Sequence, residues 1–189
     1  MLQNNKVFLA SVASATAFAV GCANTPEVMS EGTPSKTAQA AAAVGATHYT
    51  IINFPEGQDN LTPAEKQKLR QLAVVAATHG NIAEVTVLAW ADREYPAEGQ
   101  YIAKDDARLA DQRAEKIESY FKNDIQLSSD VETHNMAKRP GFFSQMLHSG
   151  DYKTKTTFEN VGAAPSDIGP GQTLLGKKAS KAIVLVKYE

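Results

Sequence analysis

The strand predicted at residues 84–91, EVTVLAWA, is apolar on both of its faces. Successive side chains of a strand point to opposite sides of the sheet, so Val85 and Val87 face one way and Leu88 and Trp90 the other. A sheet that contains such a strand must be covered by other elements on both faces. The chain therefore has to build packed layers on each side of this strand.

The spacing of apolar residues elsewhere predicts five further elements. Residues 49–54, YTIINF, are β-branched and aromatic, as is typical of a strand. Thr62 and Glu65 form a capping box that predicts a helix start, and Gly80 marks its end. The remaining predictions are a second helix that opens at Asp105 and Asp106, a strand at 131–136 and a strand at 182–188.

The order strand, helix, strand, helix, strand, strand predicts an α+β fold. Strand–helix–strand connections of this length favour parallel crossovers, so we expect a mixed sheet with two main helices on one face. The long segment 141–179 is the candidate to cover the other face, and its FFSQML stretch is apolar enough to dock there.

Length and charge limit the class of protein. The chain has 189 residues, 43% of them apolar, which suits one compact domain plus additional segments. Its formal net charge is -2, and it contains no run of lysine or arginine and no basic stripe with interleaved aromatic residues. We therefore expect no nucleic-acid partner.

The first 21 residues resemble an export signal. Lys6 precedes an apolar run of 14 residues, VFLASVASATAFAV, which is too short for a stable membrane span. A short amino-terminal helix of the folded domain is the alternative. The small residues at the end of the run and the polar residues that follow it favour the signal.

Cys22, the single cysteine, stands where the apolar run ends. The tetrapeptide at 19–22, Ala-Val-Gly-Cys, resembles a bacterial lipoprotein box, which implies cleavage before Cys22 and lipidation of that residue. The alternative is an ordinary small side chain within a signal peptide. Residues 22–46 carry few large apolar side chains, so we expect a lipidated tether there and a folded domain over 47–189.

Several catalytic and cofactor motifs are incomplete. Residues 171–178, GQTLLGKK, approach a phosphate-binding loop, but Lys178 stands where a serine or threonine must meet magnesium. The four histidines show no metal-ligand spacing, and no nucleophile motif is present. We expect no cofactor, no metal and no enzymatic activity.

Asp92 and Arg113 are the candidate site residues. Asp92 follows the carboxyl end of the strand at 84–91, where sheets of this kind bind ligands. Arg113 lies one position off the apolar stripe of the second helix, so its guanidinium can lean toward that strand end. The two charges could hold a zwitterionic group, or they could form an ion pair that only joins the helix to the sheet.

At these residues the chain resembles the OmpA-like family of peptidoglycan-binding domains, of the peptidoglycan-associated lipoprotein type. The family's Gly-His-Thr-Asp type motif corresponds to Ala-Trp-Ala-Asp at 89–92, and its Leu-Ser-x-x-Arg-Ala motif corresponds to Leu-Ala-Asp-Gln-Arg-Ala at 109–114. The resemblance runs from about residue 52 to 140 and resumes at the terminal strand. The chain departs from the family in the replaced Gly, His and Thr, in a longer stretch between the motifs and in an enlarged segment at 141–179.

The resemblance implies the family's two-layer sandwich and its function. Asp92 and Arg113 would bind the amine and the carboxylate of diaminopimelate in the wall stem peptide, and Asp106 stands where the family usually has asparagine. The chain would then be held on the periplasmic face of the outer membrane by its lipid and bind peptidoglycan noncovalently. The alternative is an adaptor lipoprotein that has lost wall binding and uses 141–179 to bind an envelope protein partner.

Overall fold

The computed structural model describes residues 34–93, 96, 103–141, 145–161 and 180–189. The helices and strands of this part of the chain follow one another in this order: α1 (Lys36–Ala43), β1 (His48–Asn53), α2 (Pro63–His79), β2 (Ile82–Ala89), α3 (Lys104–Ser119), the π-helical turn η1 (Tyr120–Asp124), β3 (Asp130–Asn135), α5 (Gly150–Val161) and β4 (Lys181–Tyr188). The expected export signal, Cys22 and the GQTLLGKK stretch lie outside the described residues.

The four strands form one mixed sheet in the order β1-β4-β2-β3. The terminal strand β4 lies between β1 and β2 and is antiparallel to both, while β2 and β3 pair in parallel. In this register Val87 lies opposite Val184 and Leu88 opposite His134. The predicted α+β class and mixed sheet are confirmed, and β2 ends at Ala89, two residues earlier than the predicted strand.

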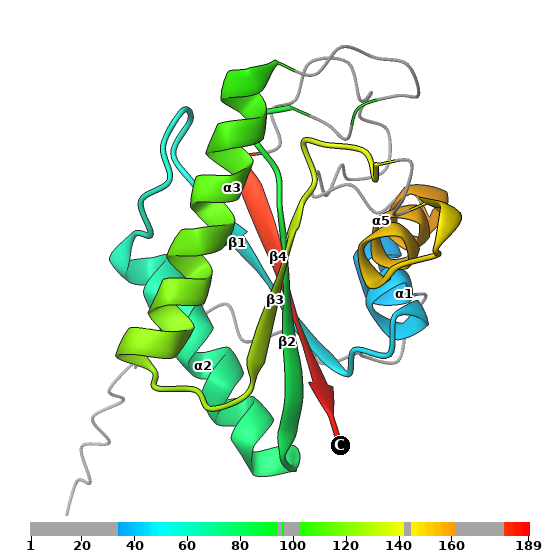
Figure 1. Cartoon of the computed structure of the whole chain (residues 1–189). Coiled ribbons are helices and arrows are strands. Elements are labelled where there is room, and N and C mark those ends of the chain that lie inside the picture. The colour runs from blue at the N-terminus through cyan, green and yellow to red at the C-terminus, as the bar shows by residue number, and fades with distance from the viewer. Residues whose placement is uncertain (1–33, 94–95, 97–102, 142–144, 162–179) are drawn as a thin grey trace, which may run out of the picture.

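The two predicted helices cover one face of the sheet, as Figure 1 shows for α2 and α3. The Thr62 side chain accepts a hydrogen bond from the Glu65 N–H at 3.3 Å and so begins α2 as expected. The Glu65 carboxylate accepts a hydrogen bond from the Asn53 N–H at 3.1 Å and thereby joins α2 to β1. Leu69 and Leu72 of α2 and Ile117 of α3 are completely buried in the core on this face.

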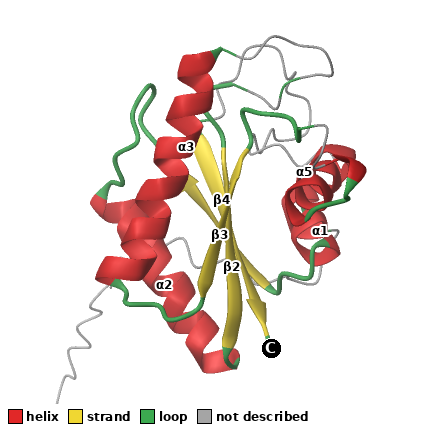
Figure 2. Ribbon diagram, in the orientation of Figure 1, coloured by secondary structure: helices red, strands yellow, loops and turns green. Residues whose placement is uncertain are grey.

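The opposite face is covered by α1 and α5, so the sheet lies between two helical layers (Figure 2). Phe158 of α5 belongs to the same apolar cluster as Leu88 and Trp90, and Trp90 is buried. The segment 141–179 thus supplies part of the cover that the sequence predicted. Its FFSQML stretch does not dock as predicted at the residues described, because Met146 and Leu147 are exposed, while Phe142 and Phe143 lie outside the described residues.

Helix α1 corrects the predicted extent of the tether. Residues 22–46 were expected to stay outside the folded domain, but Ala40 and Ala41 are buried against the sheet in the cluster that contains Trp90. Alanine side chains are small enough to let the helix backbone approach the sheet closely and have the highest helix propensity. Ser35 begins the helix by accepting a hydrogen bond from the Ala38 N–H at 3.1 Å.

Candidate functional site

Asp92 lies just beyond the carboxyl end of β2 and accepts three hydrogen bonds. The Gly57 N–H donates to Oδ2 at 2.6 Å, the Ser180 hydroxyl to Oδ1 at 2.6 Å and Arg113 Nη2 to Oδ1 at 2.8 Å. The donors come from the β1–α2 loop, from the residue before β4 and from α3. One carboxylate therefore connects three parts of the chain at this edge of the sheet.

The Asp92 carboxylate is held in its charged form. Partial burial alone would raise its pKa, but the hydrogen bonds from Ser180, Arg113 and Gly57 outweigh burial and lower the pKa below its ordinary value. The side chain keeps 17% of its surface exposed. A charged, partly accessible carboxylate is a ready acceptor for an ammonium group.

Arg113 has no exposed side-chain surface. Its Nε donates to the Gln58 carbonyl at 2.8 Å, its Nη1 to the Trp90 carbonyl at 3.0 Å and its Nη2 to the Pro55 carbonyl at 3.2 Å, in addition to Asp92. Four of the five guanidinium N–H groups thus have partners within the protein. The guanidinium also lies over the Phe54 ring, at 5.0 Å from its centroid.

The loop between β1 and α2 forms the wall of the site because of its backbone geometry. Gly57 has a φ of 67°, in the left-handed region that residues with a side chain adopt at a cost. This conformation directs its N–H to Asp92, while the carbonyls of Pro55 and Gln58 point at Arg113. The loop therefore binds both members of the ion pair at once.

Asp106, the third predicted site residue, pairs with a different arginine. Its Oδ2 lies 3.1 Å from Arg93 Nε, and Arg93 is 75% exposed. In the described part of the chain Asp106 makes no direct contact with Asp92 or Arg113. Asp106 therefore joins the site only through Arg93, the neighbour of Asp92 in the sequence.

No sequence pattern indicated the roles of Gly57 and Ser180. These residues lie 35 and 88 positions from Asp92, and no local spacing relates them to it. The Pro-Glu-Gly stretch at 55–57 predicts a turn but not the direction of its N–H groups. The prediction that Arg113 leans toward Asp92 rested on the strand end, the helix stripe and the motif resemblance, and the structure brings these two residues together.

The charged groups of this edge suit a ligand that carries an amine. Among the described residues only Gly57 donates to Asp92 Oδ2, which leaves a lone pair for a further donor. The Arg113 side chain has no exposed surface, whereas that of Arg93, the next residue after Asp92, is 75% exposed. No group of three or more His, Cys, Asp or Glu residues that could hold a metal ion is found within the described ranges.

Comparisons with known proteins give one similar structure. No protein-family model matches the chain, and no curated protein matches it. Among solved structures, it is similar to the OmpA-like domain of FopA1 from Francisella tularensis subsp. tularensis SCHU S4, with 15% sequence identity over 75% of each chain and a TM-score of 0.35. The strands, the helices and the ion pair of buried Arg113 with partly exposed Asp92 define the chain as an α+β domain with a charged site at the carboxyl end of β2.

Proposed function

We propose that the chain is a cell-envelope protein that binds peptidoglycan noncovalently at the carboxyl end of β2. The observation that carries the proposal is the Asp92 carboxylate, which is partly exposed and is kept charged by donors from three segments. The amine of diaminopimelate in the stem peptide is the group that Asp92 would bind. This assignment agrees with the motif resemblance at 89–92 and 109–114.

Arg113 and Asp106 take supporting roles in this proposal. Because Arg113 is buried and donates to three backbone carbonyls, it positions Asp92 and reaches a ligand carboxylate only if the Pro55–Gln58 loop moves. Arg93, paired with Asp106, is the cation that lies open to a ligand carboxylate at the same edge. Asp106 would then orient Arg93 rather than contact diaminopimelate.

The proposal includes a lipid anchor at Cys22 that holds the domain on the periplasmic face of the outer membrane. Its support is the position of the single cysteine at the end of the expected export signal. Across the described residues, the structure contains no helix with the length and hydropathy needed to cross a membrane.

Cosedimentation with purified peptidoglycan that contains diaminopimelate tests the wall-binding proposal. We expect the wild-type chain to sediment with the wall and Asp92→Asn to bind about 10- to 150-fold more weakly, because a charge-assisted hydrogen bond contributes about 1.5–3 kcal/mol. Asp130→Asn is the matched control, since Asp130 is exposed at the amino end of β3, at the other end of the strands from Asp92. Wild-type chain that stays in the supernatant, or equal binding by both variants, would overturn the proposal.

A second candidate function is an envelope adaptor without wall affinity. The observation that favours it is that Arg113 donates only to groups of the protein itself. An ion pair whose role is only to join α3 to the sheet would make the same contacts. In that case Asp92→Asn would lower stability while the chain never sedimented with the wall. The same experiment therefore separates the two functions.

A further inference from the structure

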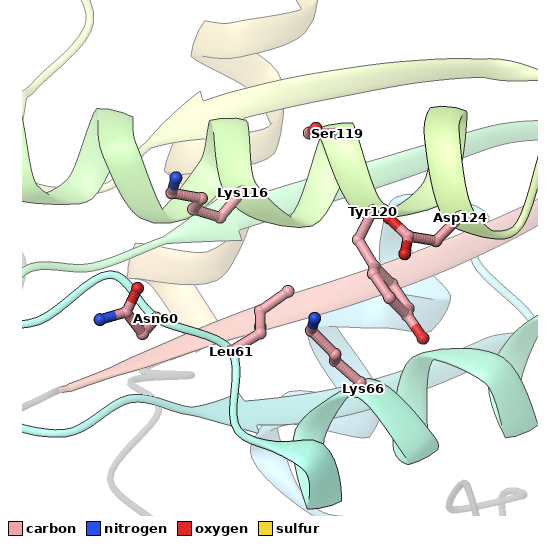
Figure 3. A pocket seen from close by; sticks show the side chains of 7 residues that line it. All are labelled: Asn60, Leu61, Lys66, Lys116, Ser119, Tyr120 and Asp124. Atoms are coloured by element: carbon pink, nitrogen blue, oxygen red, sulfur yellow. The ribbon is translucent and has the colours of Figure 1, made fainter.

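A recess lies between the loop before α2 and the end of α3. It has a volume of about 260 Å³, and Figure 3 shows its lining side chains. Its lining comes from four elements and consists of Asn60, Leu61, Lys66, Lys116, Ser119, Tyr120 and Asp124. We call this recess the Tyr120 pocket.

The Tyr120 pocket carries charges of both signs whose hydrogen-bonding capacity is unused. In the described part of the chain Asp124 makes no hydrogen bond or ion pair, and Lys66 makes only a cation–π contact, with its Nζ 5.4 Å from the centroid of the Tyr120 ring. Lys116 lies 4.0 Å from Asp59, at the limit of an ion pair. Figure 3 shows that Lys66 and Asp124 extend toward the same space beside Tyr120.

The backbone beneath this pocket is unusual. Residues 120–124 form the π-helical turn η1, in which the Ile125 N–H donates to the Tyr120 carbonyl at 3.1 Å. Such turns are rare within helices and are frequent at functional sites. The turn places Tyr120 in the floor of the pocket and Asp124 at its rim, and Arg70 holds the Tyr120 hydroxyl at 2.5 Å.

From this arrangement we infer that the Tyr120 pocket binds an amino-acid group that carries both an ammonium and a carboxylate. Asp124 accepts from the ammonium, Lys66 donates to the carboxylate, and Leu61 and the Tyr120 ring contact the carbon chain that carries both groups. The volume lies just below the range of about 300–1,000 Å³ that is typical of drug-sized ligands, so it suits one such group and not a long peptide. The inference stands on this pocket and does not require wall binding at Asp92.

Three matched probes test the charge requirement. Diaminopimelate carries both kinds of group, pimelate lacks the two amines, and cadaverine lacks the two carboxylates. Titrated into the ¹⁵N-labelled full chain in nonionic detergent, diaminopimelate should shift the backbone amide resonances of residues 60–61 and 119–125. Pimelate and cadaverine should bind at least about tenfold more weakly, because each loses one charge-assisted contact.

Two variants locate the binding. Asp124→Asn and Lys66→Gln should each weaken diaminopimelate binding about tenfold or more, whereas the control Asp130→Asn should leave it unchanged. Asp92→Asn should weaken wall sedimentation without altering the shifts at 119–125. The inference is overturned if diaminopimelate shifts no resonance in these ranges, if the three probes bind equally, or if Asp92→Asn removes the shifts while Asp124→Asn retains them.

Discussion

Arg113 is the residue whose surroundings matter most to the candidate site. A buried guanidinium is tolerated only where its charge is paired and its N–H groups have acceptors, and Arg113 has Asp92 and three carbonyls. The planar arrangement of these donors lets one side chain bind the β1–α2 loop, the end of β2 and Asp92 together. Arg113 therefore also stabilises the fold, because it connects α3 to the β1–α2 loop and to the end of β2.

Arg113→Ala should lower the free energy of unfolding by about 3 kcal/mol or more, because it leaves Asp92 without its ionic partner and three carbonyls without donors. Arg113→Lys should fall between this variant and the wild type, since one ammonium cannot reach all four acceptors. Urea unfolding curves measure both effects. Arg108→Ala is the control on the same helix, because Arg108 is 70% exposed and pairs only with Asp105. Equal stability of the Arg113→Ala and Arg108→Ala variants would contradict the claim that the contacts of Arg113 stabilise the fold.

Helix α5 is attached to the sheet by charged groups as well as by Phe158. Asp151 accepts from the Lys155 ammonium at 3.0 Å and lies 2.9 Å from His134 Nδ1, on β3. Glu132 lies 3.5 Å from the other ring nitrogen of His134. Charged and polar side chains of α5 and β3 thus attach the second helical layer to the edge strand.

This attachment should depend on pH through Asp151. Partial burial opposes its charged form, but the contacts with His134 and Lys155 prevail and lower the pKa of Asp151 below 3.8. Because the unfolded carboxyl takes up its proton first, the stabilisation is complete above pH 3.8 and is lost as the pH falls through the lowered value.

Asp151→Asn should therefore be less stable than the wild type at pH 7 and should lose less unfolding free energy between pH 6 and pH 3. Urea unfolding across this pH range measures the difference in slope. Asp130→Asn, exposed at the start of β3, should keep the slope of the wild type. Identical slopes for Asp151→Asn and the wild type would show that protonation of Asp151 does not contribute to the pH dependence of stability.

At the scale of the whole molecule, α1 brings the folded body closer to the proposed anchor. Only residues 23–35 separate Cys22 from α1, and these 13 residues span at most about 45 Å when fully extended. A tether through residue 46 would have allowed nearly twice that reach. If Cys22 is lipidated, the domain must meet its partner within this shorter distance of the membrane.

Lipidation is checked by labelling cells with a clickable palmitate analogue. The wild-type chain should be labelled and recovered with membranes, whereas Cys22→Ala should be unlabelled and absent from the mature membrane fraction. Cys22 is the one cysteine of the chain, so no other thiol can carry the label. An unlabelled wild-type chain recovered in the soluble fraction would refute the anchor.

The local features of the fold could be predicted from the amino-acid sequence. Helix periodicity and the Thr62 cap predicted α2, and alternation of β-branched and apolar residues predicted the four strands, because both patterns depend on neighbouring residues. The position of Arg113 beside the apolar stripe, together with the motif resemblance, predicted that its guanidinium leans toward Asp92. The two-sided apolar pattern of β2 likewise required the second layer that α1 and α5 supply.

The strand order and the contacts of Asp92 and Arg113 with distant segments became known only from the tertiary structure. Nothing local places β4 between β1 and β2, because strand order is set by pairing between residues as far apart as His48 and Val186. The same holds for the Ser180 hydroxyl on Asp92 and for the carbonyls around Arg113, whose direction depends on the backbone of a loop in another part of the chain. The pattern of apolar side chains predicts which face of a strand is buried. Which residues pack against that face depends on how distant segments of the chain fold together.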